Sequence, residues 1–293
     1  MKIIFSRKGF DSTAGGFASP IFPDGTLFSI PIPSTSDDFK YSDISFRYQG
    51  EPIQSVINDI TNNRIKHNNK LIACNYLDGQ QHCHHDPMLI PNSNRLVVGQ
   101  AGNSESHLRN QGVNIGDIFL FYGWFRRVEK LEGRWQYSQY SPDIHLIWSW
   151  MEIDKKLDAG SKTIRKQVIS NYPYLQPHPH FCDMPELPYL KINSVYLSRN
   201  SELLNYSRYR QLTDCKMYSG RSTWRLPACF NQPKAFTFLK NFMLDGDDVI
   251  INFKGYGQEF VLDLDKVLSE LDKADILAYF DNYIYKISSE TPI

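Results

Sequence analysis

The segment SRKGFDSTAGG, residues 6–16, holds the side chains near the amino terminus that could do chemistry. An apolar stretch leads directly into two basic residues, an aromatic residue and a carboxylate: Arg7, Lys8, Phe10 and Asp11. The glycines allow backbone N–H groups to approach an anion, and they allow a carboxylate to lie in a cleft. A tight surface turn explains the same residues equally well. We therefore treat Arg7 and Lys8 as phosphate contacts and Asp11 as a catalytic carboxylate, with the turn as the alternative.

A second carboxylate follows the glycine turn at residues 255–257. Gln258 and Glu259 begin a predicted strand there, where a carboxyl group can be partly buried and act as an acid or a base. An exposed glutamate at a strand edge is the commoner arrangement. The pattern predicts a catalytic role for Glu259 and a substrate contact for Gln258.

The segment HCHHDP, residues 82–87, contains potential metal ligands in His82, His84, His85 and Asp86. The sequence has no Cys-x-x-Cys pair, which zinc deaminases and many structural zinc sites use. A hydrogen-bonded polar pair lining a site and a solvated loop are the other interpretations. We expect no bound metal, and we assign His85 and Asp86 to substrate contacts.

The sequence lacks the short motifs of common cofactor sites. It has no GxxxxGK[ST] phosphate loop, no strand-linked GxGxxG and no GxSxG nucleophile elbow. These absences favour a reaction that needs only water, although donors without a short motif exist. We therefore expect no cofactor.

Charge and cysteine content limit the classes of partner. Lys plus Arg and Asp plus Glu number 32 each, so the chain is neutral and unlike a histone-like or tail-driven nucleic-acid binder. A local basic cleft on a neutral protein can still contact phosphates. Five cysteines without a Cys-x-x-Cys pair argue against a disulfide framework and fit a cytoplasmic location. No apolar run approaches the ~20 residues that span a bilayer, so we expect no membrane association, and nothing indicates an obligatory protein partner.

The elements that must position these residues are both strands and helices. Aromatic and β-branched runs predict strands over residues 1–6, 26–32, 44–48, 117–128, 144–153, 194–197, 235–239, 249–253 and 259–262. Apolar spacing predicts helices over residues 51–62, from about 161 onward, and over 263–285. Irregular structure is expected over residues 74–102, 129–143 and 171–189.

The chain shows no internal repeat, linker or break in composition, which favours a single domain over residues 1–293. Many strands without a regular β–α alternation predict an α+β fold built on a bent mixed sheet with a carboxyl-terminal helix. The hairpin of residues 116–127 and 144–153 resembles the core hairpins of PUA-like domains, a superfamily that includes readers of modified bases.

Taken together, several segments resemble the nucleotide modification associated domain 3 family. The matching stretches keep their order over nearly the whole chain and cover residues 6–33, 84–87, 99–126, 145–150 and 257–263. The resemblance implies a role in the biology of modified DNA bases, including conflict with bacteriophages. The family's polar motif positions fall on Asp11, His85, Asp86, Gln100, His107, Asp117 and Glu259. Cys83 and His84 crowd the HHDP motif and depart from the family pattern.

Two hypotheses follow for the chemistry. The first is a DNA glycosylase-type hydrolase that flips out a hypermodified or glucosylated cytosine-like base and cleaves its N-glycosidic bond. It assigns catalysis to Asp11, Glu259 and His107, base-edge contacts to Gln100 and His107, and stacking to Phe10, Tyr122 and Trp124. The second hypothesis is a non-enzymatic reader of modified bases. A base-modifying transferase is a further alternative.

We predict that binding to DNA weakens with salt along a shallow slope. The neutral net charge leaves only a few Lys and Arg side chains to converge on phosphates. Fluorescence anisotropy over a salt series should give a slope of log K against log salt no steeper than about −6, or roughly seven released counterions. A steeper slope would contradict a small DNA-binding cleft.

Overall fold

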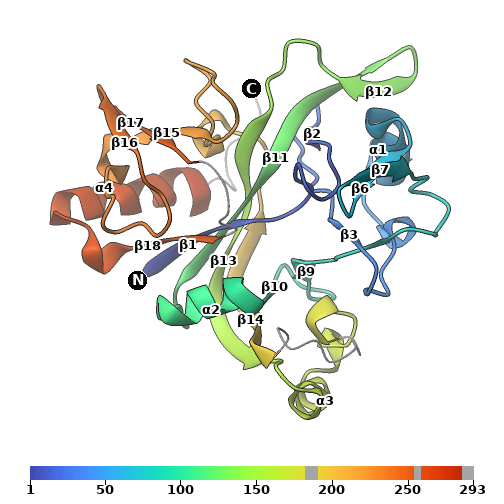
Figure 1. Cartoon of the computed structure of the whole chain (residues 1–293), viewed down its shortest axis with the longest axis horizontal. Coiled ribbons are helices and arrows are strands. Elements are labelled where there is room, and N and C mark those ends of the chain that lie inside the picture. The colour runs from blue at the N-terminus through green and yellow to red at the C-terminus, as the bar shows by residue number, and fades with distance from the viewer. Residues whose placement is uncertain (182–190, 254–258, 286–293) are drawn as a thin grey trace.

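A long two-stranded hairpin forms the centre of the fold (Figure 1). Its strands, β11 (Ile118–Leu131) and β13 (Ile144–Asp158), are rich in the aromatic and β-branched residues that favour extended backbone. They pair antiparallel, with a register shift between Phe121 and Tyr122 that marks a bulge. The computed structural model of the chain describes residues 1–181, 191–253 and 259–285.

This hairpin belongs to a mixed sheet whose described strands run in the order β18–β1–β11–β13–β14–β10–β9, with β2 and β12 also pairing to β11. The bounds of the other strands are Lys2–Arg7 (β1), Ser19–Ile21 (β2), Met88–Leu89 (β9), Leu96–Ala101 (β10), Arg134–Tyr137 (β12), Asn193–Leu203 (β14) and Glu259–Asp263 (β18). The sheet confirms the predicted α+β class. It is open at β18 and β9, and the described strands close no barrel.

The register of β1 places the basic amino-terminal loop. Within the sheet, β1 runs antiparallel to β18, so that Ser6 pairs with Glu259, and parallel to β11, so that Arg7 pairs with Tyr122. Lys8 follows at the end of β1, and its backbone N–H donates to the Tyr122 carbonyl at 2.9 Å. The chain therefore leaves the sheet beside the buried glutamate of β18.

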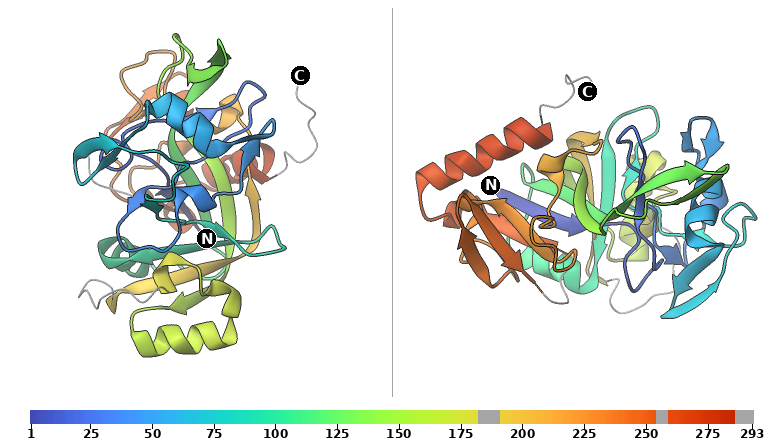
Figure 2. Two further views of the ribbon diagram at one scale, coloured as in Figure 1. Left: turned by 90° about the vertical axis from the view of Figure 1, so that its right-hand side faces the viewer. Right: turned by 90° about the horizontal axis from the view of Figure 1, so that it is seen from above.

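Two packed clusters lie on opposite sides of the central hairpin, as the two views of Figure 2 show. The amino-terminal cluster packs around α1 (Ile53–Thr61), whose apolar residues recur at helical spacing and are buried. Small paired strands complete it: β3 (Pro33–Ser34) with β8 (His82–Cys83), β4 (Arg47–Tyr48) with β5 (Glu51–Pro52), and β6 (Arg64–His67) with β7 (Lys70–Ala73).

The carboxyl-terminal cluster packs on the β1 and β18 side of the sheet. It contains a three-stranded sheet and the helix α4, whose bounds are Thr223–Pro227 (β15), Phe242–Asp245 (β16), Asp248–Asn252 (β17) and Glu270–Phe280 (α4). Trp224 is fully buried there, with its ring centroid 5.9 Å from that of Phe5 and 5.6 Å from that of Phe260. Two further helices flank the sheet: α2 (Gly102–Asn110) and α3 (Lys162–Asn171).

Two predicted strands are wrong. Residues 26–32 are irregular apart from an isolated bridge at Leu27, and Pro31 cannot donate a hydrogen bond to a ladder. Residues 235–239 make only a single bridge, from Phe236 to Leu262 of β18, and Phe238 has a left-handed φ of 60° that prevents a longer strand. The apolar side chains of both segments pack into the clusters that flank the sheet.

Two segments expected to be irregular contain strands, and the last helix is shorter than predicted. Residues 74–102 include β10, and residues 129–143 include β12. The apolar runs of these strands are short and lie among polar residues, so the sequence pattern does not reveal them. The last helix begins only at Glu270, because the Ser269 side chain accepts from the Asp272 N–H and caps it. Among the described residues, no helix combines the length and apolar character needed to cross a membrane.

Candidate functional site

A buried ion pair lies in the wall of a polar cavity of about 350 Å³. Lys8 Nζ donates to Asp86 Oδ2 at 2.7 Å, and the Gly99 N–H donates to Asp86 Oδ1 at 2.9 Å. The Asp86 side chain is fully buried, and that of Lys8 is 12% exposed. Burial by itself would raise the pKa of Asp86, but the Lys8 charge and His178 hold it well below the usual range. Asp86 is therefore an ionised carboxylate.

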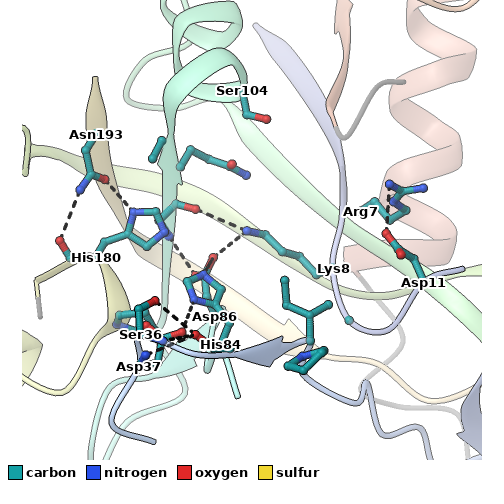
Figure 3. A pocket seen from close by; sticks show the side chains of 18 of the residues that line it. Arg7, Lys8, Asp11, Ser36, Asp37, His84, Asp86, Ser104, His180 and Asn193 are labelled. Carbon is teal, nitrogen blue, oxygen red and sulfur yellow. Dashed lines mark hydrogen bonds and ion pairs between the residues drawn. The ribbon is translucent and has the colours of Figure 1, made fainter. Parts of the chain in front are cut away.

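Two imidazoles face this carboxylate, and each is held by its other ring nitrogen (Figure 3). His84 Nδ1 lies 2.8 Å from Asp37 Oδ2, and His180 Nδ1 lies 2.6 Å from Asn193 Oδ1. Burial lowers the pKa of His180 to about 3, so this imidazole is neutral at physiological pH.

Distant elements bring these groups together. Lys8 ends β1, Asp86 precedes the edge strand β9, and His180 lies in a short 3-10 turn, Pro179–Phe181. The turn packs directly on Gly99 of β10, where an added Cβ would lie 2.2 Å from the His180 ring. Glycine is therefore required at this position by close approach of the imidazole.

The carboxyl group of Glu259 lies behind the cavity wall and is hydrogen-bonded to residues that form the wall. Gln100 Nε2 donates to Glu259 Oε1 at 2.9 Å, and Ser6 Oγ lies 3.4 Å from the same oxygen. Burial raises the pKa of Glu259, and the opposing effects of Lys8, Ser104, Gln100 and Ser6 are smaller. Gln100 and Ser104 line the cavity. The site thus combines an ionised carboxylate with a second carboxyl group whose pKa is raised by burial.

Asp11 and Arg7 also line the polar cavity and form an ion pair at 3.2 Å, away from His84 and Asp86 (Figure 3). Asp11 Oδ1 accepts from the Thr13 N–H, the Thr13 hydroxyl and the Ala14 N–H at 2.6–2.8 Å. Burial alone would raise the pKa of Asp11, but these hydrogen bonds and Arg7 lower it. Its carboxylate is ionised and committed to the turn.

An aromatic hollow of about 460 Å³ adjoins the polar cavity. His85 stacks on Phe39 with ring centroids 4.1 Å apart, and Phe28 lies against Phe46 with centroids 4.9 Å apart. The hollow is also lined by Trp148, whose buried Nε1 has no hydrogen-bond partner among the described residues. Burial lowers the pKa of His85 to about 4, so the stacked ring is neutral. Such walls suit a flat aromatic ligand.

Asp86 and Gly9 belong to the linings of both hollows. These residues therefore stand at the partition between a polar space and an aromatic space. Of the residues predicted from the sequence, this arrangement brings together Arg7, Lys8, Asp11, His85, Asp86 and Gln100, with Glu259 behind them.

Other predicted site residues lie elsewhere. Phe10 and Tyr122 are fully buried in the flanking cores, which leaves neither ring free to stack on a base. Trp124 lies under Arg221, whose Cζ is 4.1 Å from the ring centroid. His107 Nε2 lies 3.1 Å from Thr237 Oγ1, outside both hollows.

Asp117 and Gln258 also lie outside the two hollows as the structure describes them. Asp117 accepts from the Lys2 and Asn114 N–H groups at 2.7 Å and 2.9 Å and so fixes the start of β11. Gln258 lies outside the described residues.

Sequence reasoning missed several residues of the site: Asp37, His180, Asn193, Phe39 and Trp148. The motif PHPHF in the proline-rich segment carries two histidines, His178 and His180, and was the available signal. His178 Nε2 lies 3.4 Å from Asp86 Oδ1. Nothing local in the sequence joins this segment to residues 82–87.

Comparison with known proteins identifies one family. The family model described as nucleotide modification associated domain 3 matches residues 2–263, which covers every described residue of the two hollows. No curated protein and no solved structure matches the chain.

We predict that Lys8→Met lowers the free energy of unfolding by about 3–5 kcal/mol at pH 7, because Asp86 would remain buried without its cation. Without Lys8, burial raises the pKa of Asp86, so protonation in acid relieves the penalty. In the wild type, the lowered pKa of Asp86 stabilises the fold at pH values above the ordinary aspartate pKa. This stabilisation is lost as the pH falls through the lowered pKa of Asp86. The two stability curves should therefore converge toward acid.

Urea unfolding of both proteins across this pH range measures the difference. The exposed Lys70→Met serves as a matched control, and its effect should stay within about 0.5 kcal/mol. A Lys8→Met deficit that does not change with pH would contradict the assignment.

Proposed function

Because the chain belongs to the nucleotide modification associated domain 3 family, we propose that it is a DNA glycosylase-type hydrolase. Its substrate would be DNA containing a hypermodified or glucosylated cytosine-like base. The reaction would cleave the N-glycosidic bond and leave an abasic site, as an activity directed against bacteriophage DNA.

The observation that carries this proposal is the position of Asp86 between two unlike hollows. A nucleoside joins a flat aromatic base to a polar sugar through one C–N bond. A flipped base would fill the hollow lined by Phe28, Phe39 and Trp148, while its sugar would face the polar cavity. The glycosidic bond would then lie near the ionised carboxylate.

The chemistry requires little more than an anion at that point. As the C1′–N bond breaks, positive charge develops on the sugar, and Asp86 would stabilise it. The same carboxylate would orient a water whose oxygen forms the new bond to C1′. The base would leave with the bonding electron pair, and the attacking water would release its proton to solvent through the polar cavity.

Asp86 cannot protonate the leaving base, because it is held ionised. Glu259 has the raised pKa expected of a proton donor, and the Ser104 hydroxyl, which bonds to it, lines the cavity. We assign Glu259 to proton supply through this hydroxyl and Asp11 to positioning of Arg7 for a phosphate. His107 would act only indirectly, since it lines neither hollow.

We predict that Asp86→Asn lowers single-turnover base release by about a hundredfold or more, the scale for a positioned acid–base group. The substrate is an oligonucleotide with one glucosylated 5-hydroxymethylcytosine, and alkali converts each abasic site into a strand break. Asp38→Asn, an exposed aspartate in the same segment as Asp37, should leave the rate unchanged. Asp11→Asn and Glu259→Gln should give smaller losses.

Melting temperatures taken in parallel separate loss of activity from loss of fold. Retention on the modified oligonucleotide without strand breaks by the wild type would indicate a reader. A mass change on the base that requires an added donor would indicate a transferase. Near-full activity of a folded Asp86→Asn protein would disprove the assignment of Asp86.

A further inference from the structure

We propose that His84, Asp86 and His180 form a binding site for a divalent first-row transition-metal ion such as Zn²⁺. Each residue offers one ligand atom, and these atoms lie within 4.8 Å of one another. Two imidazoles and one carboxylate are a common donor set for catalytic zinc and for iron. The cluster faces the polar cavity, which all three residues line.

The hydrogen bonds of Asn193 fix which nitrogen of His180 is available. The Asn193 amide nitrogen donates to the Ala159 carbonyl at 3.3 Å and to the His180 carbonyl at 3.4 Å. Its oxygen therefore faces His180 Nδ1 and can only accept, so Nδ1 carries the proton. His180 Nε2 is left with its lone pair, the form that binds a metal.

His84 is oriented in the same way by a carboxylate. Its Nδ1 donates to the buried Asp37 at 2.8 Å, and its Nε2 faces Asp86 Oδ2 at 3.8 Å. A carboxylate that accepts from the distal nitrogen of a histidine ligand is the usual second layer of such metal sites. An ion between His84 Nε2 and Asp86 Oδ2 would take the position that a proton occupies when His84 is charged.

The local charge leaves room for a cation. Asp37 and Asp86 contribute two negative charges to the cluster, and Lys8 contributes one positive charge by its bond to Asp86. Each carboxylate oxygen has two lone pairs, so Asp86 Oδ2 can accept from Lys8 and still coordinate an ion.

The geometry requires a small closure. Zinc bonds to nitrogen and oxygen are about 2.0–2.2 Å, so tetrahedral ligand atoms lie roughly 3.4 Å apart. The widest separation of 4.8 Å must therefore shorten by about 1.4 Å. The His84 side chain is 25% exposed and precedes the sheet edge, so it can make that movement. Three protein ligands leave one position open toward the cavity, where an ion would lower the pKa of a bound water.

The spacing of residues 82–87 alone predicts no bound metal. We propose a metal site instead because His180, from a different segment, adds a third ligand to His84 and Asp86. It does not depend on base excision, since ion binding is measured without DNA.

The test uses the full chain with Cys215→Ser, which removes an exposed thiol that could bind zinc. After EDTA treatment and dialysis, calorimetric titration with Zn²⁺ should show one equivalent bound. Titration with Co²⁺ should give the visible bands of a four- or five-coordinate ion. His84→Gln and His180→Gln should each weaken binding at least tenfold, and Asp37→Asn by about 10- to 100-fold. His67→Gln, on the separate β6–β7 hairpin, should bind as the parent does.

Melting temperatures of the metal-free variants identify any that fail to fold. His84→Gln, at a partly exposed position, decides the matter if His180→Gln unfolds. The proposal is overturned if the parent protein binds no saturating equivalent, or if the folded His84→Gln and His180→Gln proteins bind Zn²⁺ as tightly as the parent.

Discussion

The buried charge of Asp86 is the constraint on which the site depends. A carboxylate removed from water is costly unless a cation and hydrogen-bond donors compensate it. Lys8 supplies the cation from the end of β1, and Gly99 supplies the backbone N–H from β10. These two strands do not pair with each other, so they must keep their relative positions for the charge to be tolerated. The charge that makes the site reactive thus couples it to the central sheet.

The same constraint explains why segments far apart in the chain converge. The His84–Asp86 segment precedes the sheet edge, and the turn carrying His180 covers Gly99 because that residue lacks a side chain. Around the carboxylate, polar groups gather on one side and aromatic rings on the other. A ligand with one polar and one flat apolar half matches this division, as a nucleoside does.

Strong local patterns made most of the sheet predictable, and tertiary contacts made much of the site unpredictable. The aromatic runs of β11 and β13 and the short apolar β1 and β18 indicate strands because burial on the sheet repeats along them. Lys8, Asp86 and Gln100 were identified from polar motifs. His180 and Trp148 were missed, since only folding brings them to Asp86. Phe10 and Tyr122 were assigned to stacking because composition cannot distinguish a core ring from an exposed one.

The central claim, that a buried Asp86 is held ionised, is tested most directly by carbon-13 NMR of its carboxyl group in the metal-free protein. The Asp86→Asn spectrum assigns the signal, which is followed as the pH is lowered. We expect the Asp86 carboxyl carbon to keep the chemical shift of an ionised carboxylate at pH values well below the ordinary aspartate pKa of about 3.9, until the protein unfolds. A titration of this carbon at or above that value, in folded protein, would contradict the account.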